Sequence, residues 1–464
     1  MRTTTTKKMS ILVLAGCFLG IAPAFAQKQT PPEGTPPKPF TVPANETYTL
    51  PNGMKVTLVP YGIIPKAAIS VAVDAGSLNE GKNRVGVADL TGELFKEGTV
   101  MLTSQQLAKE TGSMGSTLSV VVGADQTKLE LDVLEEFAPQ AVRLLADVAE
   151  HPRLPESELA RLKNDSLRKI AVQTSQPQTV AAMHFRKILY GDHPYGTLLP
   201  TPDDVKKLTI EDVKDYYASN FGAQRTHLYV AGKFDTAAVK KSIQESFGSW
   251  AKGPARVENV PSPKAKKVLD VTDRPGAPQS TLMVGLPVVP PTSPDAIPLG
   301  VTNALLGGSF NSRITSNIRE QRGYTYSPFS EISRRYHDAY WAQHADVTTQ
   351  FTGASLKEIF LEIDRLQKEP PSVAELKGIQ NYLSGVFVIQ NSSRTALINQ
   401  LQYVDLQGLG SDYLKNYVQK VNAVTPADVQ KMASQYIKPD EMILVVVGDQ
   451  SKIADQLAPY KTSN

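Results

Sequence analysis

Cysteine is almost absent from this chain of 464 residues. Cys17 is the only one, so no disulfide bond can form within the chain. Stability therefore has to come from buried apolar surface. A chain of this length is too long for one ordinary core, and we expect two or more domains.

An excess of charge of either sign is also absent. The formal net charge is +3, and three of the cations, Arg2, Lys7 and Lys8, lie within the first 26 residues. The remainder is formally neutral and holds no basic tract that would bind nucleic acid or an anionic membrane. We therefore expect no nucleic-acid partner.

Long hydrophobic runs are missing after the N-terminus, which predicts no membrane span. The one such run, 9–22, follows a basic start and precedes Ala24-Phe25-Ala26, a pattern typical of a secretory signal over 1–26. This favours an exported, periplasmic protein. A lipid anchor at Cys17 is the alternative, because Leu14 to Cys17 matches a lipoprotein box; the apolar residues that follow favour cleavage after Ala26 instead.

Several familiar site patterns are absent as well. The six histidines show no metal-ligand spacing, and no nucleophile elbow or phosphate-binding glycine loop occurs. His193 stands in a His-Pro-Tyr-Gly loop, where we expect a packed side chain rather than a ligand.

The most informative stretch present is 84–99, R-V-G-V-A-D-L-T-G-E-L-F-K-E-G-T. Its apolar residues recur at helical spacing, and Asp89 and Glu93, four residues apart, share one helix face. Gly92 lies one turn into this helix, where most other residues would favour the helix more.

This stretch resembles the zinc-site helix of the pitrilysin/insulinase metallopeptidases, the inverzincins, which read roughly G-x-A-H-x-x-E-H-x-x-F-K-G-T. The frame residues match at Gly86, Ala88, Phe95, Lys96, Gly98 and Thr99. The resemblance places Asp89 and Glu93 where the two histidine ligands belong and Gly92 where the general base belongs. It places Lys169, inside a predicted helix over 155–172, near the third ligand. An ammonium repels a cation and has no lone pair, so the resemblance implies no metal in this chain.

Asp89 and Glu93 leave two interpretations open. They form either a new carboxylate metal site or a solvated helix face, and the second is favoured because carboxylates usually face water. The first would make the chain a metallopeptidase on its own.

A second stretch, 303–328, resembles the second domain of the same family. There a glycine-containing loop precedes a helix ending in Arg-x-x-Arg-Gly-x-x-Tyr, and an Arg and a Tyr seven residues apart reach the peptide at the zinc. The matching residues are Arg319 and Tyr326, with Gly323 as the helix stop, and Gly307 and Gly308 as the substrate-contacting loop. An ordinary ion-paired Arg, a core Tyr and a simple turn are the alternatives.

The two halves of the chain repeat one another. Thr209-x-x-Asp212 precedes a strand ending at Gly232, and Thr425-x-x-Asp428 precedes a strand ending at Gly448, with the same offset of 23 residues. The resemblance implies an α+β fold of two homologous domains, each a mixed, mostly antiparallel sheet with helices on one face, forming half of a clam-like peptide chamber. We expect these boundaries: a signal peptide at 1–26, a Pro-rich tether at 27–43, domains at 44–252 and 268–460, and a linker at 253–267.

Together these features resemble the non-catalytic, Arg/Tyr-bearing subunit of a heterodimeric bacterial peptidase of the mitochondrial processing peptidase type. The resemblance implies a partner, a homologous subunit that holds the zinc, and short unfolded peptides as substrates, with no cofactor in this chain. The alternative is a non-hydrolytic structural or peptide-binding protein, similar to the family members that serve as core subunits of membrane complexes.

Overall fold

The computed structural model describes residue 41 and residues 43–461. The predicted signal peptide, Cys17 and nearly all of the predicted tether lie outside this part. Among the described residues, no helix is both long enough and apolar enough to cross a bilayer.

The first half is built on a six-stranded sheet in the order β1-β2-β6-β3-β5-β4. Only β2 and β6 pair in parallel; the other neighbours are antiparallel. The strands are β1 (Glu46–Thr49), β2 (Lys55–Pro60), β3 (Lys66–Val73), β4 (Ser119–Val122), β5 (Thr127–Leu134) and β6 (Thr226–Gly232).

The second half repeats this arrangement in a five-stranded sheet, β7-β11-β8-β10-β9. Its one parallel pair, β7 with β11, corresponds to β2 with β6. The strands are β7 (Val268–Asp273), β8 (Gln279–Val288), β9 (Phe329–Arg335), β10 (Asp338–Thr348) and β11 (Ile443–Gly448). The shared strand order confirms the predicted repeat and the α+β class.

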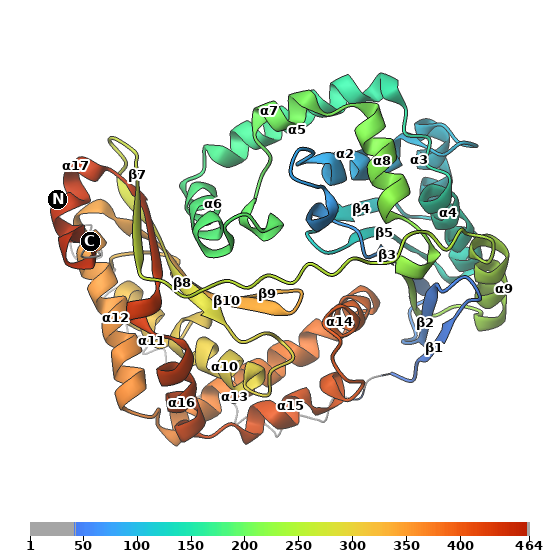
Figure 1. The fold of residues 1–464 in the computed structure, drawn as a ribbon. Coiled ribbons are helices and arrows are strands. Elements are labelled where there is room, and N and C mark those ends of the chain that lie inside the picture. The colour runs from blue at the N-terminus through green and yellow to red at the C-terminus, as the bar shows by residue number, and fades with distance from the viewer. Residues whose placement is uncertain (1–40, 42, 462–464) are drawn as a thin grey trace, which may run out of the picture. The chain divides into compact units, whose positions relative to one another are not determined.

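Helices fill the intervals between the strands (Figure 1). In the first half they are α2 (Val87–Leu94), α3 (Ser104–Ser113), α4 (Ala138–Glu150), α5 (Glu156–Thr174), α6 (Pro177–Tyr190), α7 (Pro202–Lys207), α8 (Ile210–Asn220) and α9 (Thr236–Phe247). In the second half they are α10 (Ala296–Asn303), α11 (Arg313–Thr315), α12 (Thr352–Lys368), α13 (Val373–Gln390), α14 (Arg394–Leu406), α15 (Tyr413–Ala423), α16 (Pro426–Tyr436) and α17 (Gln450–Leu457), with π-helical segments at Ala304–Gly308 and Ser316–Gln321.

The repeated Thr-x-x-Asp pattern has a local cause. Thr209 and Thr425 are the N-cap residues of α8 and α16, and each hydroxyl accepts a hydrogen bond from the backbone N–H of the Asp three residues on. That Asp accepts the backbone N–H of the Thr in return. Such a capping box satisfies backbone donors that a helix start otherwise leaves unpaired.

Each half has its own apolar core between its sheet and its helices. Alternate residues of β3, such as Ile69 and Val71, pack with Phe95 and the α4 helix in the first half. Trp341 and the residues Leu444 and Val446 of β11 belong to the corresponding core of the second half.

The opposite face of each sheet is covered by a helix of the other half. Helix α6 packs on the second sheet, where Phe185 meets residues of β8 and β11. Helix α14 packs on the first sheet, where Leu397 and Ile398 meet the intervening residues of β3, Ala68 and Ala72. Both sheets are therefore buried on two faces at these strands, which explains their continuous apolar runs.

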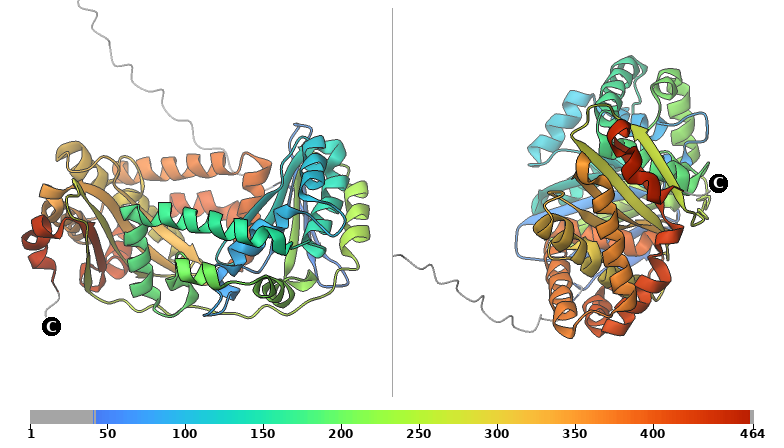
Figure 2. Two further views of the ribbon diagram at one scale, coloured as in Figure 1. Left: turned by 90° about the horizontal axis from the view of Figure 1, so that it is seen from above. Right: turned by 90° about the vertical axis from the view of Figure 1, so that its left-hand side faces the viewer.

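Two segments of the chain pass from the first half to the second. Helix α5 leads from the first half toward α6, as the left-hand view in Figure 2 shows. Between Phe247 and Val268 the chain forms no helix or strand and runs from α9 to β7 (Figure 1). The predicted linker, 253–267, falls in this segment, and we retain the predicted domain boundaries as a proposal.

Candidate functional site: a degenerate metal helix and a separate Arg–Tyr pair

Helix α2 begins where the sequence predicts it. Gly86 has a φ of 94°, a conformation that glycine adopts cheaply. The buried Glu80 carboxylate accepts a hydrogen bond of 2.9 Å from the backbone N–H of Ala88. Burial raises the pKa of Glu80 to about 7, so this group holds the helix start at the expense of its own ionisation.

Gly92 is explained by the close approach of strand β4. A Cβ atom built at residue 92 would overlap Cγ2 of Val122 and lie 3.5 Å from Cγ1 of Val120. The Val122 side chain therefore occupies the space that a larger side chain at residue 92 would need. A longer side chain, such as that of a general base, cannot be placed here unless the Val122 side chain moves.

Glu93 and Lys169 lie near enough to Asp89 for their charges to act on its carboxylate. The Asp89 side chain is exposed to the cavity that it lines, and the protein that surrounds the cavity desolvates the carboxylate enough to raise its pKa. The positive charge of Lys169 on α5 opposes the shift, and the charge of Glu93 adds to it. Glu93 itself is exposed and forms an ion pair of 2.6 Å with Lys96.

These residues do not fit a zinc ion. One carboxylate is paired with a lysine, the position of the base is closed by Val122, and an ammonium stands at the third position. Among residues 41 and 43–461, no group of three or more His, Cys, Asp or Glu side chains could hold a metal ion. Within the described residues, helix α2 therefore belongs to no such ligand group.

The Arg319–Tyr326 pair does form. The guanidinium carbon of Arg319 lies 5.0 Å from the centre of the Tyr326 ring and 4.4 Å from that of Phe310, a cation–π geometry. Gly323, with a φ of 65°, ends the helical segment between the two residues as predicted. Tyr326 is 78% exposed and Phe310 is 64% exposed, so this cluster presents aromatic rings to solvent.

Gly307 and Gly308 are explained by packing. A Cβ at Gly307 would lie 2.6 Å from both Gln343 Oε1 and Ser330 Oγ, and one at Gly308 would overlap Asn303. Contact with a substrate at these glycines stays a prediction.

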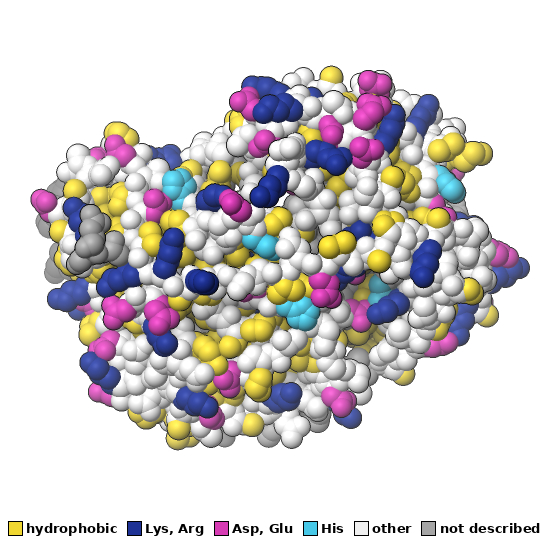
Figure 3. All heavy atoms as spheres, in the orientation of Figure 1, with side chains coloured by type: hydrophobic (Ala, Val, Ile, Leu, Met, Phe, Trp, Pro, Cys, Tyr) yellow, Lys and Arg dark blue, Asp and Glu magenta, His cyan; other side chains and the backbone are white. Residues whose placement is uncertain are grey.

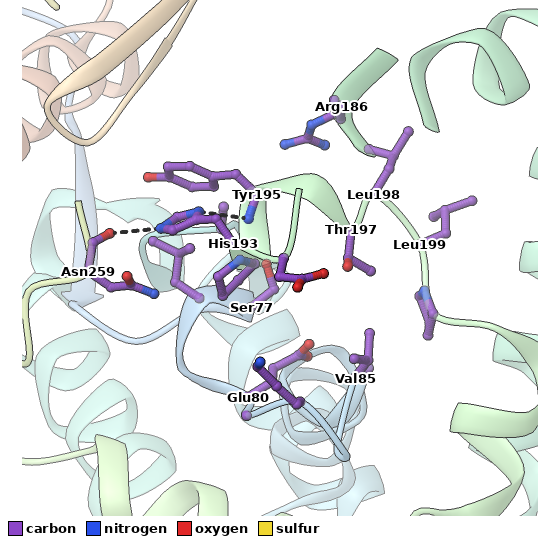
Figure 4. A pocket seen from close by; sticks show the side chains of 18 of the residues that line it. Ser77, Glu80, Val85, Arg186, His193, Tyr195, Thr197, Leu198, Leu199 and Asn259 are labelled. Atoms are coloured by element: carbon purple, nitrogen blue, oxygen red, sulfur yellow. Dashed lines mark hydrogen bonds between the residues drawn. The ribbon is translucent and has the colours of Figure 1, made fainter. Parts of the chain in front are cut away.

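His193 lies in the wall of the cavity as a hydrogen-bonded loop residue. Its Nδ1 accepts from the backbone N–H of Tyr195 at 3.2 Å, and its Nε2 lies 3.1 Å from the carbonyl oxygen of Asn259 (Figure 4). Both ring nitrogens therefore have protein partners.

The cavity has a volume of about 830 Å³ and connects Asp89 with residues that the sequence analysis did not single out. These residues are Glu80, Arg186 on α6 and Arg335 on β9. They belong to no local motif, because the fold brings them together from three distant segments. Arg319 and Tyr326 are not among the residues that line the cavity.

Charged side chains of both signs are mixed on the face of the molecule that Figure 3 shows, where they are interspersed over both halves. This distribution agrees with the formal charge of +3 for the whole chain, and it favours no polyanionic partner.

Comparison with known proteins matches both halves to one family. The model for Insulinase (Peptidase family M16) matches residues 62–203, and the model for the Peptidase M16 inactive domain matches residues 207–383.

Three relatives match over more than nine-tenths of their own length. The uncharacterized zinc protease YmxG of Bacillus subtilis (strain 168) is 24% identical over 408 residues, 86% of this chain and 97% of the relative. The non-peptidase homolog YmxG of Helicobacter pylori is 21% identical, covering 96% of this chain and 99% of the relative. The beta subunit of the Saccharomyces cerevisiae mitochondrial-processing peptidase is 23% identical, covering 89% and 93%.

Two crystal structures share the fold. A peptidase M16 inactive domain from Pseudomonas fluorescens has a TM-score of 0.81 at 24% identity, covering 87% of this chain and 98% of its own. A protease from Helicobacter pylori has a TM-score of 0.82 at 20% identity, covering 88% and 100%. With both halves and the whole fold matched, this chain belongs to the insulinase family of peptidases, M16.

Proposed function

We propose that this chain is the non-zinc subunit of an exported heterodimeric zinc endopeptidase that degrades short unfolded peptides. The observation that carries the proposal is a contrast between two sites in one chain. Val122 closes the base position on α2, whereas Arg319 and Tyr326 stack together with the Tyr326 ring 78% exposed.

The retained pair has a chemical use beside a scissile amide. Attack on an amide builds negative charge on the carbonyl oxygen, and the Tyr326 hydroxyl is a neutral donor suited to stabilise it. The Arg319 guanidinium stays ionised and offers planar donors to peptide carbonyls. Stacking against Tyr326 and an ion pair of 3.2 Å with Glu320 orient the Arg319 guanidinium before a peptide binds.

The partner is a homologous chain that carries the intact His-x-x-Glu-His motif and the zinc. Three observations support this arrangement. The ligands are lost here, the Arg–Tyr pair lies outside the cavity that Asp89 lines, and relatives bear the names of both zinc proteases and a non-peptidase homolog. The pattern of residues 1–26 supports export to the periplasm.

The test is peptide cleavage by the purified chain mixed with its zinc-bearing partner. Tyr326→Phe should lower kcat about 100-fold, because an oxyanion donor is lost. Tyr382→Phe is the matched control, since Tyr382 is also exposed, at 47%, but lies on α13 away from Arg319.

Full activity of Tyr326→Phe would remove the catalytic role of this residue. The absence of any cleavage with a partner that carries the intact motif would favour the alternative, a non-hydrolytic structural or peptide-binding protein.

A further inference from the structure

Two arginines from different halves of the chain line the cavity without a carboxylate partner. Arg186 on α6 is only 8% exposed, and its side chain forms no hydrogen bond or ion pair with any residue that the structure describes. Arg335, at the end of β9, donates one hydrogen bond to the backbone carbonyl of Arg334, and its Nε is buried without a partner.

The unpaired state of Arg186 is energetically unfavourable. Burial lowers its pKa, and the positive charge of Arg335 lowers it further. A guanidinium nevertheless stays ionised in proteins. A buried ion with unused donors is costly unless something pairs with it, which points to a ligand that the chain does not supply.

The neighbouring acidic groups already have partners. Asp125 accepts a hydrogen bond from Tyr195 (2.6 Å), Asp338 accepts one from Tyr190 (2.6 Å), Glu331 lies 3.4 Å from His344, and Asp192 pairs with Lys187 (3.1 Å). The charges of Arg335 and Arg186 help to lower the pKa of Glu331, so this carboxylate balances part of their charge from beyond ion-pair distance. None of these carboxylates lies within ion-pair distance of Arg186 among the described residues.

Figure 4 shows how Arg186 lies within the cavity. Its guanidinium points toward the side of Tyr195 and has no dashed line to any residue drawn. Leu198 and Leu199 lie on one side of it, and Glu80 and Val85 lie on the wall that leads to α2. The arginine therefore stands in a mixed polar and apolar wall.

We propose that Arg186 and Arg335 bind the carboxylate group of a short peptide held in this cavity. The planar guanidinium matches a carboxylate in a bidentate geometry. A volume of about 830 Å³ is in the range of small-ligand sites. From this anchor the cavity extends to Asp89 and to Val122 on the edge strand β4, so a bound peptide reaches the degenerate helix.

The carboxylate has two sources, the peptide C-terminus and an acidic side chain. Three fluorescently labelled peptides of one sequence separate them: one with a free C-terminus and no acidic residue, one with an amidated C-terminus, and one amidated with a single Glu. Each is titrated by anisotropy against the isolated full chain without partner or zinc, so the result stands apart from the proposed cleavage.

We expect at least one carboxylate-bearing peptide to bind at least 10-fold more tightly than the amidated peptide without Glu, and inorganic phosphate to compete. The peptide that binds identifies the source of the carboxylate. Arg186→Met should abolish this difference, and Arg186→Lys should restore only part of it because the planar fork is lost. Arg143→Met is the control, since Arg143 is an exposed arginine on α4 outside the cavity.

If Arg186 had only a structural role, its replacement would lower the thermal midpoint of the chain. Because Arg186 has no side-chain partner, Arg186→Met should keep or raise the thermal midpoint. Arg335→Met, made on its own, should also weaken binding of the same peptide. Equal binding of all three peptides, no binding of any, or unchanged binding by both variants would overturn the proposal, as would a loss of folding in Arg186→Met with normal binding by Arg335→Met.

Discussion

At the scale of single residues, Gly92 is explained by packing against Val122 and not by a catalytic role. The resemblance implies that glycine replaces a general base here, but it does not tell what fills the space. Val122, thirty residues away in the chain, fills that space. The replacement is visible only in the structure, because periodicity does not tell which side chain of an edge strand faces a given helix turn.

A double-mutant cycle tests this contact. Alanine is favoured over glycine within a helix by about 1 kcal/mol, but at residue 92 its Cβ would overlap Val122, and overpacking costs about 1–3 kcal/mol. Gly92→Ala should therefore be more favourable in a Val122→Ala background than in the wild type by at least about 1 kcal/mol. Urea unfolding measures the effect of Gly92→Ala on the free energy of unfolding in each background. Equal effects in the two backgrounds would show that residues 92 and 122 do not occupy the same space.

The Arg319–Tyr326 pair makes a second prediction at this scale. Removing the charge but keeping the ring contact, as in Arg319→Met, should leave stability within about 0.5 kcal/mol, because Tyr326 and Phe310 are exposed and the ion pair that is lost, with Glu320, lies at the surface. The same change should weaken peptide binding in the presence of the partner. Unfolding and KM measurements separate the two effects, and a large loss of stability would indicate a structural pair instead.

At the scale of elements, most helices and strands follow from patterns in the sequence. The capping boxes at Thr209 and Thr425 and the apolar run of β11 each identify an element locally. Helix α3 extends to Ser113, because its capping box at Thr103 and Gln106 starts a full helix in a polar stretch. Apolar periodicity is weak there, so the pattern gave little sign of its length.

The start of α2 predicts a specific pH dependence. Folded Glu80 has a pKa of about 7, against 4.5 for the unfolded chain. The folded state therefore binds more protons between these values, and stability falls as the pH rises from about 4.5 to 7, by about 3 kcal/mol at most. Urea unfolding at several pH values should show this slope reduced in Glu80→Gln.

Glu136→Gln, at an exposed position just before α4, should leave the slope unchanged. An unaltered slope in Glu80→Gln would place the titrating group elsewhere, for example at Glu150, whose pKa burial also raises to about 7.

At the scale of the whole described chain, the exchange of α6 and α14 between the halves could not be predicted. The sequence shows that β11 is apolar throughout, but not which helix covers its second face. Arg394 at the start of α14 forms a bidentate ion pair with Asp132 of β5, at 2.7 and 2.9 Å. This contact spans 262 residues of sequence, a separation at which local patterns carry no information.

The exchange predicts that the two halves unfold together. Leu397 is fully buried on α14 against the first sheet. Leu397→Ala should therefore lower the free energy of unfolding by about 2–5 kcal/mol. The chain has two tryptophans, Trp250 in the first core and Trp341 in the second. In single-tryptophan variants, Leu397→Ala should shift both fluorescence transitions in urea equally.

Leu361→Ala is the control, because Leu361 is 48% exposed on α12. Separate shifts of the two tryptophan signals would show that the halves are independent and that α14 does not couple them.

The central claim is that this chain has lost the metal site that its helix α2 once framed. The zinc content of the full chain, purified alone without chelator, tests it most directly. Val122, Lys169 and the Glu93–Lys96 pair predict well under one zinc per chain, with no change in Asp89→Ala. One zinc per chain, lost in Asp89→Ala, would contradict the claim.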